Sequence, residues 1–193
     1  GVQTCALPIY LKKLDEEFKL DIRYASINNF MRSKFYVNER AFFNMSAADR
    51  LIEAKNELKE LGYGIIIYDA YRPWFVTKMF WEGTPENLKH FVANPENGSS
   101  HNKGCAIDIG LYDIETGESI DMISGYDEFT ERAYPNYMGG SKKQRDIRDM
   151  LIKVMEKNDF TVYEYEWWHF NYNKCDSGIM NYSFSELDSL NSI

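Results

Sequence analysis

Two short stretches that lie far apart in the sequence restrict how this chain can fold. The first runs from Ser99 to Asp108, and the second runs from Glu166 to His169. The chain has 3 histidines, and two of them, His101 and His169, stand in these stretches together with a carboxylate residue. Imidazole nitrogens and a carboxylate oxygen bind zinc, and three such ligands leave a fourth position open for water. A fold that brings His101, Asp108 and His169 together would therefore build a hydrolytic site with one zinc ion.

The size and charge of the chain narrow the class of protein. With 193 residues, of which 44% are hydrophobic, the chain is long enough for one globular domain. The 30 acidic residues outnumber the 22 basic ones, and the net charge of −8 repels the phosphates of nucleic acids and of anionic lipids. No apolar run approaches the roughly 18 residues that cross a membrane. We therefore expect neither a nucleic-acid partner nor an integral membrane segment, and the sequence leaves the oligomeric state open.

The three cysteines, Cys5, Cys105 and Cys175, show no C-x-x-C spacing. A disulfide framework and a thiolate zinc site are therefore not expected, and the odd number weakly favours a reducing compartment. Cys105 falls on the apolar face of a predicted strand, so we expect it to be a core residue.

The first nine residues differ in character from the rest of the chain. Residues 1–9 lack an initiator methionine and resemble translated sequencing-adapter residues. We interpret them as a non-native head and residues 10–193 as the domain. A native amino terminus, with any export signal, would then be missing. The sequence is therefore compatible with a cytoplasmic or with a periplasmic, exported location in a bacterium.

Hydrophobic periodicity predicts the main elements. Apolar residues at steps of three and four predict helices over 47–61 and 142–157, the first with an acidic capping box from Ser46 to Asp49. The β-branched run Tyr63–Tyr68 predicts a strand covered on both faces, and strict alternation predicts a second strand over 105–112. Further expected elements are a brief helix near 11–18, extended segments at 21–25 and 35–37, helices at 74–82 and 85–91, strands at 119–122, 160–165 and 167–172, and a loop-rich cleft wall at 124–140.

The residues of the two stretches have complementary chemical roles. Gly104 lies between His101 and Asp108, and its conformational freedom allows the loop to fold back so that both side chains reach one metal ion. Glu166 stands three residues before His169, so a regular strand would place the two on opposite faces and a bend or bulge is needed. A carboxylate beside the metal can take the proton of the attacking water, which makes Glu166 the candidate general base.

Arg72 follows a predicted strand, and its fixed charge can stabilise the oxyanion that forms when water attacks a carbonyl group. Taken alone, each of these residues has a simpler interpretation. His101 or His169 would be a partly buried structural histidine, and Arg72, which precedes Pro73, would be a surface residue at a helix start. The residues as a group favour the metal site. His90 is interpreted as a solvated helix residue, and the four tryptophans as core.

Five motifs of the chain occur in the order of one known family: Asp21-Ile22-Arg23-Tyr24-Ala25, Asp69-Ala70-Tyr71-Arg72-Pro73, the S-x-H-x-x-G-x-A-x-D stretch from Ser99 to Asp108, Tyr126-Asp127-Glu128-Phe129, and Glu166-Trp167-Trp168-His169. On these motifs the sequence resembles the VanX-like D-alanyl-D-alanine dipeptidases, zinc peptidases related to the VanY-type carboxypeptidases. The resemblance covers nearly the whole chain from Asp21 onward. By the same resemblance, the connection between Arg72 and Ser99 is expected to be shorter than in the VanX proteins of vancomycin-resistance clusters, which would place the chain nearer to the housekeeping relatives.

The resemblance implies a fold, a cofactor and a mechanism. The fold would be α+β, a single domain with a central, mainly antiparallel sheet and flanking helices, as in hedgehog-like and DD-peptidase-like proteins. One zinc ion would be bound by His101, Asp108 and His169. Glu166 would be the general base, and Arg72 would stabilise the tetrahedral intermediate of D-Ala-D-Ala hydrolysis.

The resemblance also implies substrate contacts. Asp127 would pair with the free ammonium of the dipeptide, and Tyr24 and Ser99 would line the pocket. This pairing favours free dipeptides, because an acylated amine cannot form the ion pair. Two alternatives stay open: a peptidoglycan DD-carboxypeptidase or endopeptidase with the same metal ligands, and a non-catalytic zinc-stabilised binding domain, against which Glu166 and Arg72 argue.

Overall fold

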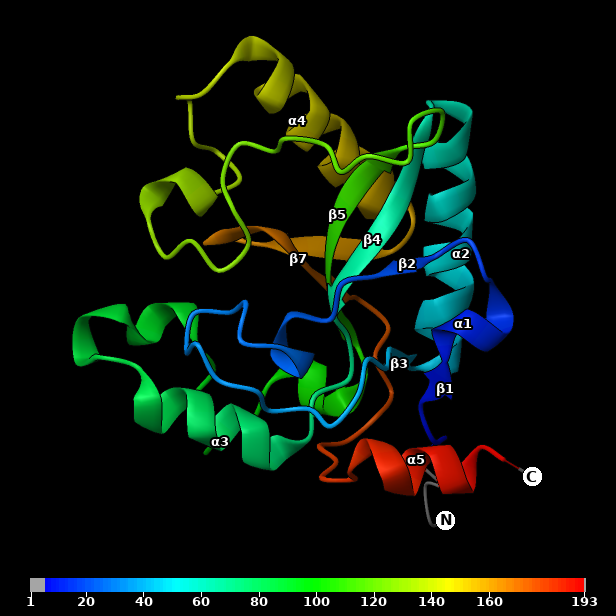
Figure 1. Ribbon diagram of the computed structural model, residues 1–193, viewed down its shortest axis with the longest axis vertical. Helices are drawn as coiled ribbons and strands as arrows, with labels where there is room; N and C mark the ends of the chain where they lie inside the picture. Colours follow the sequence, from blue (N-terminus) through cyan, green and yellow to red (C-terminus); the bar gives the residue numbers. More distant parts are fainter. Residues whose placement is uncertain (1–5, 193) are drawn as a thin grey trace.

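A five-stranded sheet organises the chain, whose residues 6–192 are described by a computed structural model (Figure 1). The strand order is β2 (Lys19–Leu20), β4 (Tyr63–Asp69), β5 (Ala106–Asp113), β7 (Glu166–Tyr172) and β6 (Phe160–Tyr163). In this sheet β2 runs parallel to β4, and the other three neighbouring pairs are antiparallel. The predicted α+β fold with a central, mainly antiparallel sheet is confirmed.

Helices flank the sheet. α2 (Met45–Glu60) packs on β4, and α4 (Lys142–Lys157) packs on β6 and against α2. α3 (Trp74–Gly83) and α5 (Phe184–Leu190) lie at the opposite end of the molecule from α4 in Figure 1. None of the helices within residues 6–192 combines the length and the apolar character needed to cross a bilayer. Short elements complete the fold: β1 (Ile9–Tyr10), paired with β3 (Phe42–Phe43), α1 (Leu11–Leu14), and the 3-10 helices η1 (Arg23–Ala25), η2 (Glu86–Phe91), η3 (Ser100–Lys103) and η4 (Glu131–Ala133).

One face of the sheet carries the core. Ile65 and Ile67 of β4 pair with Leu111 and Ile109 of β5, and all four join residues of α2 such as Leu51 in one buried cluster. Side chains alternate between the two faces of a strand, so residues at even-numbered positions of β5 point the other way. The second face is therefore free to carry polar side chains.

The long elements begin and end close to their predicted positions. α4 spans the predicted range, and Ser141 and Gln144 form a capping box at its start. The predicted capping box of α2 at Ser46 is wrong. The side chain of Asn44 accepts the backbone N–H of Ala47 instead. Asn is among the strongest N-cap residues, and the helix therefore begins two residues earlier than predicted.

Three predicted extended segments are wrong. Residues 23–25 form η1, which turns the side chain of Tyr24 into the interior. Residues 35–37 form no strand, because the N–H groups of Phe35 and Tyr36 both bond to the carbonyl of Tyr24. Residues 119–122 contribute an isolated bridge between Ser119 and Tyr112 and no strand. At these places hydrogen bonds within and between nearby loop segments replace the strand pairing that the local sequence favours.

The connection between β5 and α4 forms a wall beside the sheet, as predicted for residues 124–140. Apart from η4, this range contains neither helix nor strand. Helix α4 holds the wall: Arg145 donates to the carbonyls of Gly139 and Gly140, and Arg148 donates to the carbonyl of Tyr137. The wall is therefore supported by a helix and not by strand pairing.

A disulfide joins Cys105, directly before β5, to Cys175, just after β7, with the Cα atoms 5.9 Å apart. Cys105 is buried as expected, but the expectation that the cysteines form no disulfide framework is wrong for this pair. Cys5 lies outside the described residues. The two bonded cysteines are 70 residues apart in the sequence. The spacing of cysteines in the sequence does not reveal a pair that only the packing of neighbouring strands brings together.

Part of the predicted non-native head is packed in the fold. Residues 1–5 lie outside the described residues, whereas Ile9 pairs with Phe43 and the carbonyl of Pro8 accepts a hydrogen bond from Asn191. The origin of residues 1–9 and the domain boundary at residue 10 stay predictions.

Replacement of Cys175 by Ser should lower the free energy of unfolding by about 4 kcal/mol, because a disulfide that closes a long loop restricts the unfolded chain. Urea denaturation followed by circular dichroism measures the loss. Wild-type protein in dithiothreitol should lose the same amount, and the variant should not respond to the reductant. Equal unfolding midpoints for variant and oxidised wild type would contradict a stabilising disulfide.

Candidate metal centre and active site

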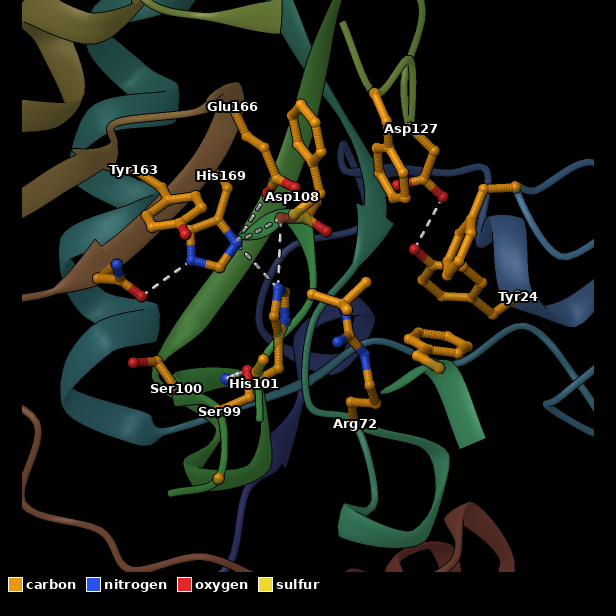
Figure 2. A pocket seen from close by; sticks show the side chains of 18 residues that line it. Tyr24, Arg72, Ser99, Ser100, His101, Asp108, Asp127, Tyr163, Glu166 and His169 are labelled. Carbon is orange, nitrogen blue, oxygen red and sulfur yellow. Dashed lines mark hydrogen bonds and ion pairs between the residues drawn. The ribbon is translucent and has the colours of Figure 1, made fainter. Parts of the chain in front are cut away.

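The pairing of β5 with β7 places Asp108 opposite His169, and His101 comes from η3, the turn that leads into β5. Oδ1 of Asp108 lies 3.0 Å from Nδ1 of His169 and 3.3 Å from Nε2 of His101. These two nitrogens are 3.2 Å apart. Figure 2 shows the three side chains pointing at one another. The three residues predicted as metal ligands are thus brought together from segments far apart in the sequence.

The outer nitrogens of both imidazoles have hydrogen-bond acceptors. Nδ1 of His101 lies 2.6 Å from the carbonyl oxygen of Ala70, and Nε2 of His169 lies 2.9 Å from Oδ1 of Asn171. Both partners are acceptors, an arrangement that favours the tautomer in which each outer nitrogen carries the proton and each inner nitrogen turns its lone pair toward Asp108.

Oδ1 of Asp108 is a buried carboxylate oxygen without a hydrogen-bond partner. An ionised oxygen and two nitrogen lone pairs at these distances repel one another unless a cation lies between them. The three donors therefore fit a metal ion. Two imidazoles and one carboxylate are a ligand set that zinc accepts.

Local hydrogen bonds shape the turn that carries His101. Ser99 and Asn102 form a capping box at the start of η3, and Gly104 ends it with a φ of 66°, a left-handed conformation open to glycine without strain. The amide of Asn102 also donates to the carbonyl of Arg72 at 2.8 Å. The prediction that Gly104 lets the loop fold back is confirmed, and the turn is tied to the end of β4.

Glu166 lies beside the cluster because the pairing of β6 with β7 shifts register after Val162. The predicted irregularity is present, and Oε2 of Glu166 lies 3.8 Å from Nδ1 of His169. Burial, together with the charges of Asp108 and Asp127, raises the pKa of Glu166 well above its ordinary value. A carboxyl group with a raised pKa can take up a proton and hold it for a later transfer.

Arg72 is buried in the segment between β4 and α3, with 8% of its surface exposed. Its Nε and Nη2 donate to Oδ2 of Asp69 at 3.0 and 2.8 Å, and the other oxygen of Asp69 accepts the hydroxyl of Tyr36 at 2.8 Å. The guanidinium carbon lies 4.8 Å from the ring centre of Phe80. Arg72 is therefore a fixed charge in the cavity wall, and its interpretation as a surface residue is wrong.

Asp127 faces the cluster from the loop over 124–140. Its φ of 57° is uncommon for a residue other than glycine, and Asp is among the side chains that adopt it most readily. Oδ2 of Asp127 accepts the hydroxyl of Tyr24 at 2.8 Å. Burial raises the pKa of Asp127 to about 7 despite this hydrogen bond. The carboxylate is thus poised to gain from a cationic partner.

These side chains surround one cavity of about 210 Å³. Figure 2 shows the three metal-ligand candidates and Glu166 on one side, Asp127 and Tyr24 on the other, and Arg72 between them. Aromatic side chains complete the wall: Phe30, Phe80, Phe91, Phe129 and Tyr163. Every residue predicted to belong to the site lines this cavity: Tyr24, Arg72, Ser99, His101, Asp108, Asp127, Glu166 and His169.

Three residues in contact with the site were not predicted to act there. Asn171 bonds to His169 from the same strand, and a spacing of two residues would have placed both on one face. Asp69 ends β4 and is the first residue of the motif that contains Arg72, which is a local signal. The hydroxyl of Tyr126 donates to Oδ2 of Asp108, a contact that depends on how the loop closes over the sheet.

The donor set, the neighbouring carboxylate and the buried arginine define a class, the metallopeptidases. Within it the chain belongs to the Peptidase_M15 family, described as D-ala-D-ala dipeptidase, whose model matches residues 6–188. It is 30% identical over 183 residues to the D-alanyl-D-alanine dipeptidase of Enterococcus faecalis, covering 84% of this chain and 89% of the relative. The dipeptidase of Enterococcus faecium is 31% identical over 182 residues (83% and 89%), and that of Escherichia coli K12 30% over 154 residues (80% and 78%). The family predicted from the motifs is confirmed.

His169→Ala should lose the bound metal, because only two of the three ligands remain, whereas His90→Ala should keep it. Elemental analysis of the purified proteins measures this, with about one zinc ion per chain expected in wild type. His90 is the matched control, since it is the third histidine and lies outside the cavity lining. Full zinc content in His169→Ala would contradict the ligand assignment.

Proposed function

We propose that this chain is a zinc-dependent dipeptidase that hydrolyses D-alanyl-D-alanine to D-alanine. Relatives at 30% and 31% identity carry that name. The observation that carries the proposal is the position of Asp127, which faces the metal-ligand cluster across a cavity of about 210 Å³. In this proposal a dipeptide occupies the cavity with its ammonium at Asp127 and its peptide carbonyl at the cluster.

Nε2 of His101, Oδ1 of Asp108 and Nδ1 of His169 would hold the zinc ion. When bound there, zinc supplies Lewis-acid polarisation of the carbonyl and acidifies water. Glu166 takes the proton of the attacking water and passes it to the nitrogen of the departing D-alanine. Its raised pKa favours the protonated form that the second transfer requires.

Arg72 stabilises the negative charge that develops on the carbonyl oxygen. A guanidinium that is already fixed and shielded from water acts more strongly than a mobile one, because no reorganisation accompanies the reaction. Its two hydrogen bonds to Asp69 provide this fixation. Ser99 lines the same cavity and limits the space around the substrate.

Asp127 selects peptides with a free amino group. An ammonium ion neutralises its carboxylate, and the hydroxyl of Tyr24 holds one carboxylate oxygen in place. An acylated peptide would instead cover a charged group without supplying a partner, which is unfavourable. We therefore favour a dipeptidase over a carboxypeptidase or endopeptidase of peptidoglycan.

Release of alanine from three substrates tests this function: D-Ala-D-Ala, L-Ala-L-Ala and N-acetyl-D-Ala-D-Ala, each with and without a chelator. We expect chelator-sensitive hydrolysis of D-Ala-D-Ala and little hydrolysis of the acetylated peptide. Equal rates for the free and the acetylated peptide would instead support a carboxypeptidase. No hydrolysis of any of them by the zinc-loaded protein would support a binding domain.

Glu166→Gln should keep its zinc and lose at least about a hundredfold in kcat, because an amide cannot accept the proton of the attacking water. Zinc content and steady-state rates on D-Ala-D-Ala measure the two effects separately. A variant that retains zinc and full hydrolysis would show that another group is the base.

The KM for D-Ala-D-Ala should rise several-fold between about pH 7.5 and about pH 6, because only ionised Asp127 pairs with the ammonium and the competent fraction falls below a pKa of about 7. Steady-state kinetics across this range give the profile. In Asp127→Asn the KM should be high at every pH and the rise should disappear. An unchanged rise in that variant would assign the titration to another group.

A further inference from the structure

Tyr126 connects the two ends of the cavity through its hydroxyl group. This hydroxyl lies 2.8 Å from Oδ2 of Asp108 and 3.2 Å from the hydroxyl of Tyr24. The hydroxyl of Tyr24 in turn lies 2.8 Å from Oδ2 of Asp127. Four oxygens thus form a row from the metal-ligand candidate Asp108 to Asp127, and of the four residues only Tyr126 lies outside the cavity lining.

The two oxygens of Asp108 have different surroundings. Oδ1 faces the imidazole nitrogens of His101 and His169 and has no hydrogen-bond partner, whereas Oδ2 accepts the hydroxyl of Tyr126. A carboxylate held at one oxygen cannot rotate without breaking that hydrogen bond. Tyr126 therefore fixes which oxygen of Asp108 faces the cluster.

The ring of Tyr126 is itself held in place. Its centre lies 4.8 Å from that of Tyr68 and 5.3 Å from that of Trp168, the latter edge to face, and the guanidinium carbon of Arg23 lies 5.5 Å from it. Aromatic neighbours in such arrangements restrain a ring. The position of the hydroxyl is thus set by packing outside the cavity.

The row of four oxygens has three contacts but only two hydroxyl protons. When both carboxylates are ionised, each tyrosine donates to its own carboxylate, and no proton remains for the contact between Tyr126 and Tyr24. That central contact is the longest of the three, at 3.2 Å against 2.8 Å for the others. Tyr126 therefore donates its hydrogen bond to Asp108, and Tyr24 donates its hydrogen bond to Asp127.

We propose that Tyr126 is a positioning residue for the metal ligand Asp108, and that Tyr24, one contact further along, has no such role. The proposal rests on the metal site of the proposed function. A group that orients a ligand contributes to metal affinity, and its removal typically lowers that affinity ten- to a hundredfold.

Tyr126→Phe removes the hydroxyl and keeps the ring, and Tyr24→Phe is the matched control. Competition with a chromophoric chelator gives the zinc dissociation constants of both variants and of wild type. We expect Tyr126→Phe to bind zinc about tenfold or more weakly than wild type, and Tyr24→Phe to bind it as wild type does. The visible spectrum of the cobalt(II)-substituted protein, which reports ligand geometry, should change in Tyr126→Phe alone.

Denaturation of the zinc-free proteins separates positioning from folding, because a purely structural hydroxyl would lower the unfolding midpoint and leave the zinc affinity of folded protein unchanged. A folded Tyr126→Phe with wild-type zinc affinity overturns the proposal, and so does equal weakening in Tyr24→Phe. If Tyr126→Phe does not fold, Tyr126→Met, whose flexible apolar side chain occupies part of the space of the ring, is measured in the same way and judged by the same outcomes. Wild-type protein that binds no zinc would contradict the proposed function instead.

Discussion

The antiparallel pairing of β5 with β7 is the constraint on which the rest of the site depends. It sets Asp108 opposite His169, and the pairing of β5 with β4 sets Asp69 on the other side of Asp108. Ile107 and Phe170 are paired on the opposite face and fully buried. A slip of one residue would exchange the two faces. The apolar core therefore fixes the register that sets Asp69, Asp108 and His169 side by side. The geometry of the candidate metal site thus depends on packing on the face of the sheet away from the cavity.

The polar side of the sheet is short of positive charge. Asp69, Asp108 and Glu166 are buried, and the fixed cation Arg72 is already paired with Asp69. The pKa values of Glu166 and Asp127 are raised, because it is costly to bury a carboxylate that has no positively charged partner. In the proposed function a metal ion relieves it at Asp108 and the substrate ammonium relieves it at Asp127. The same excess of buried negative charge then explains why one end of the cavity would bind a metal ion and the other end an ammonium group.

Sequence patterns predict the features whose causes are local. The periodicity of α4 and the β-branched run of β4 each report the buried face of one element, so their bounds were predicted closely. The site residues were found through motif order. The disulfide and the contact of Tyr126 with Asp108 were not found, because they depend on which strands pair and how a loop closes over them. α5 is an intermediate case: its capping box at Ser183 is local, but the weak hydrophobic pattern of the tail gave no helix.

The loop that carries Asp127 has a support of its own, the hydrogen bonds from Arg145 and Arg148 of α4 to its carbonyls. An insertion or exchange within this loop leaves the strand register intact. In the proposed function, a change in this loop would therefore alter which amino-terminal groups are accepted without moving Asp108 or His169 from their paired positions. Tyr126 limits such changes: it lies in the same loop and donates to Asp108, so under the proposed positioning role an exchanged loop would need a hydrogen-bond donor at that position.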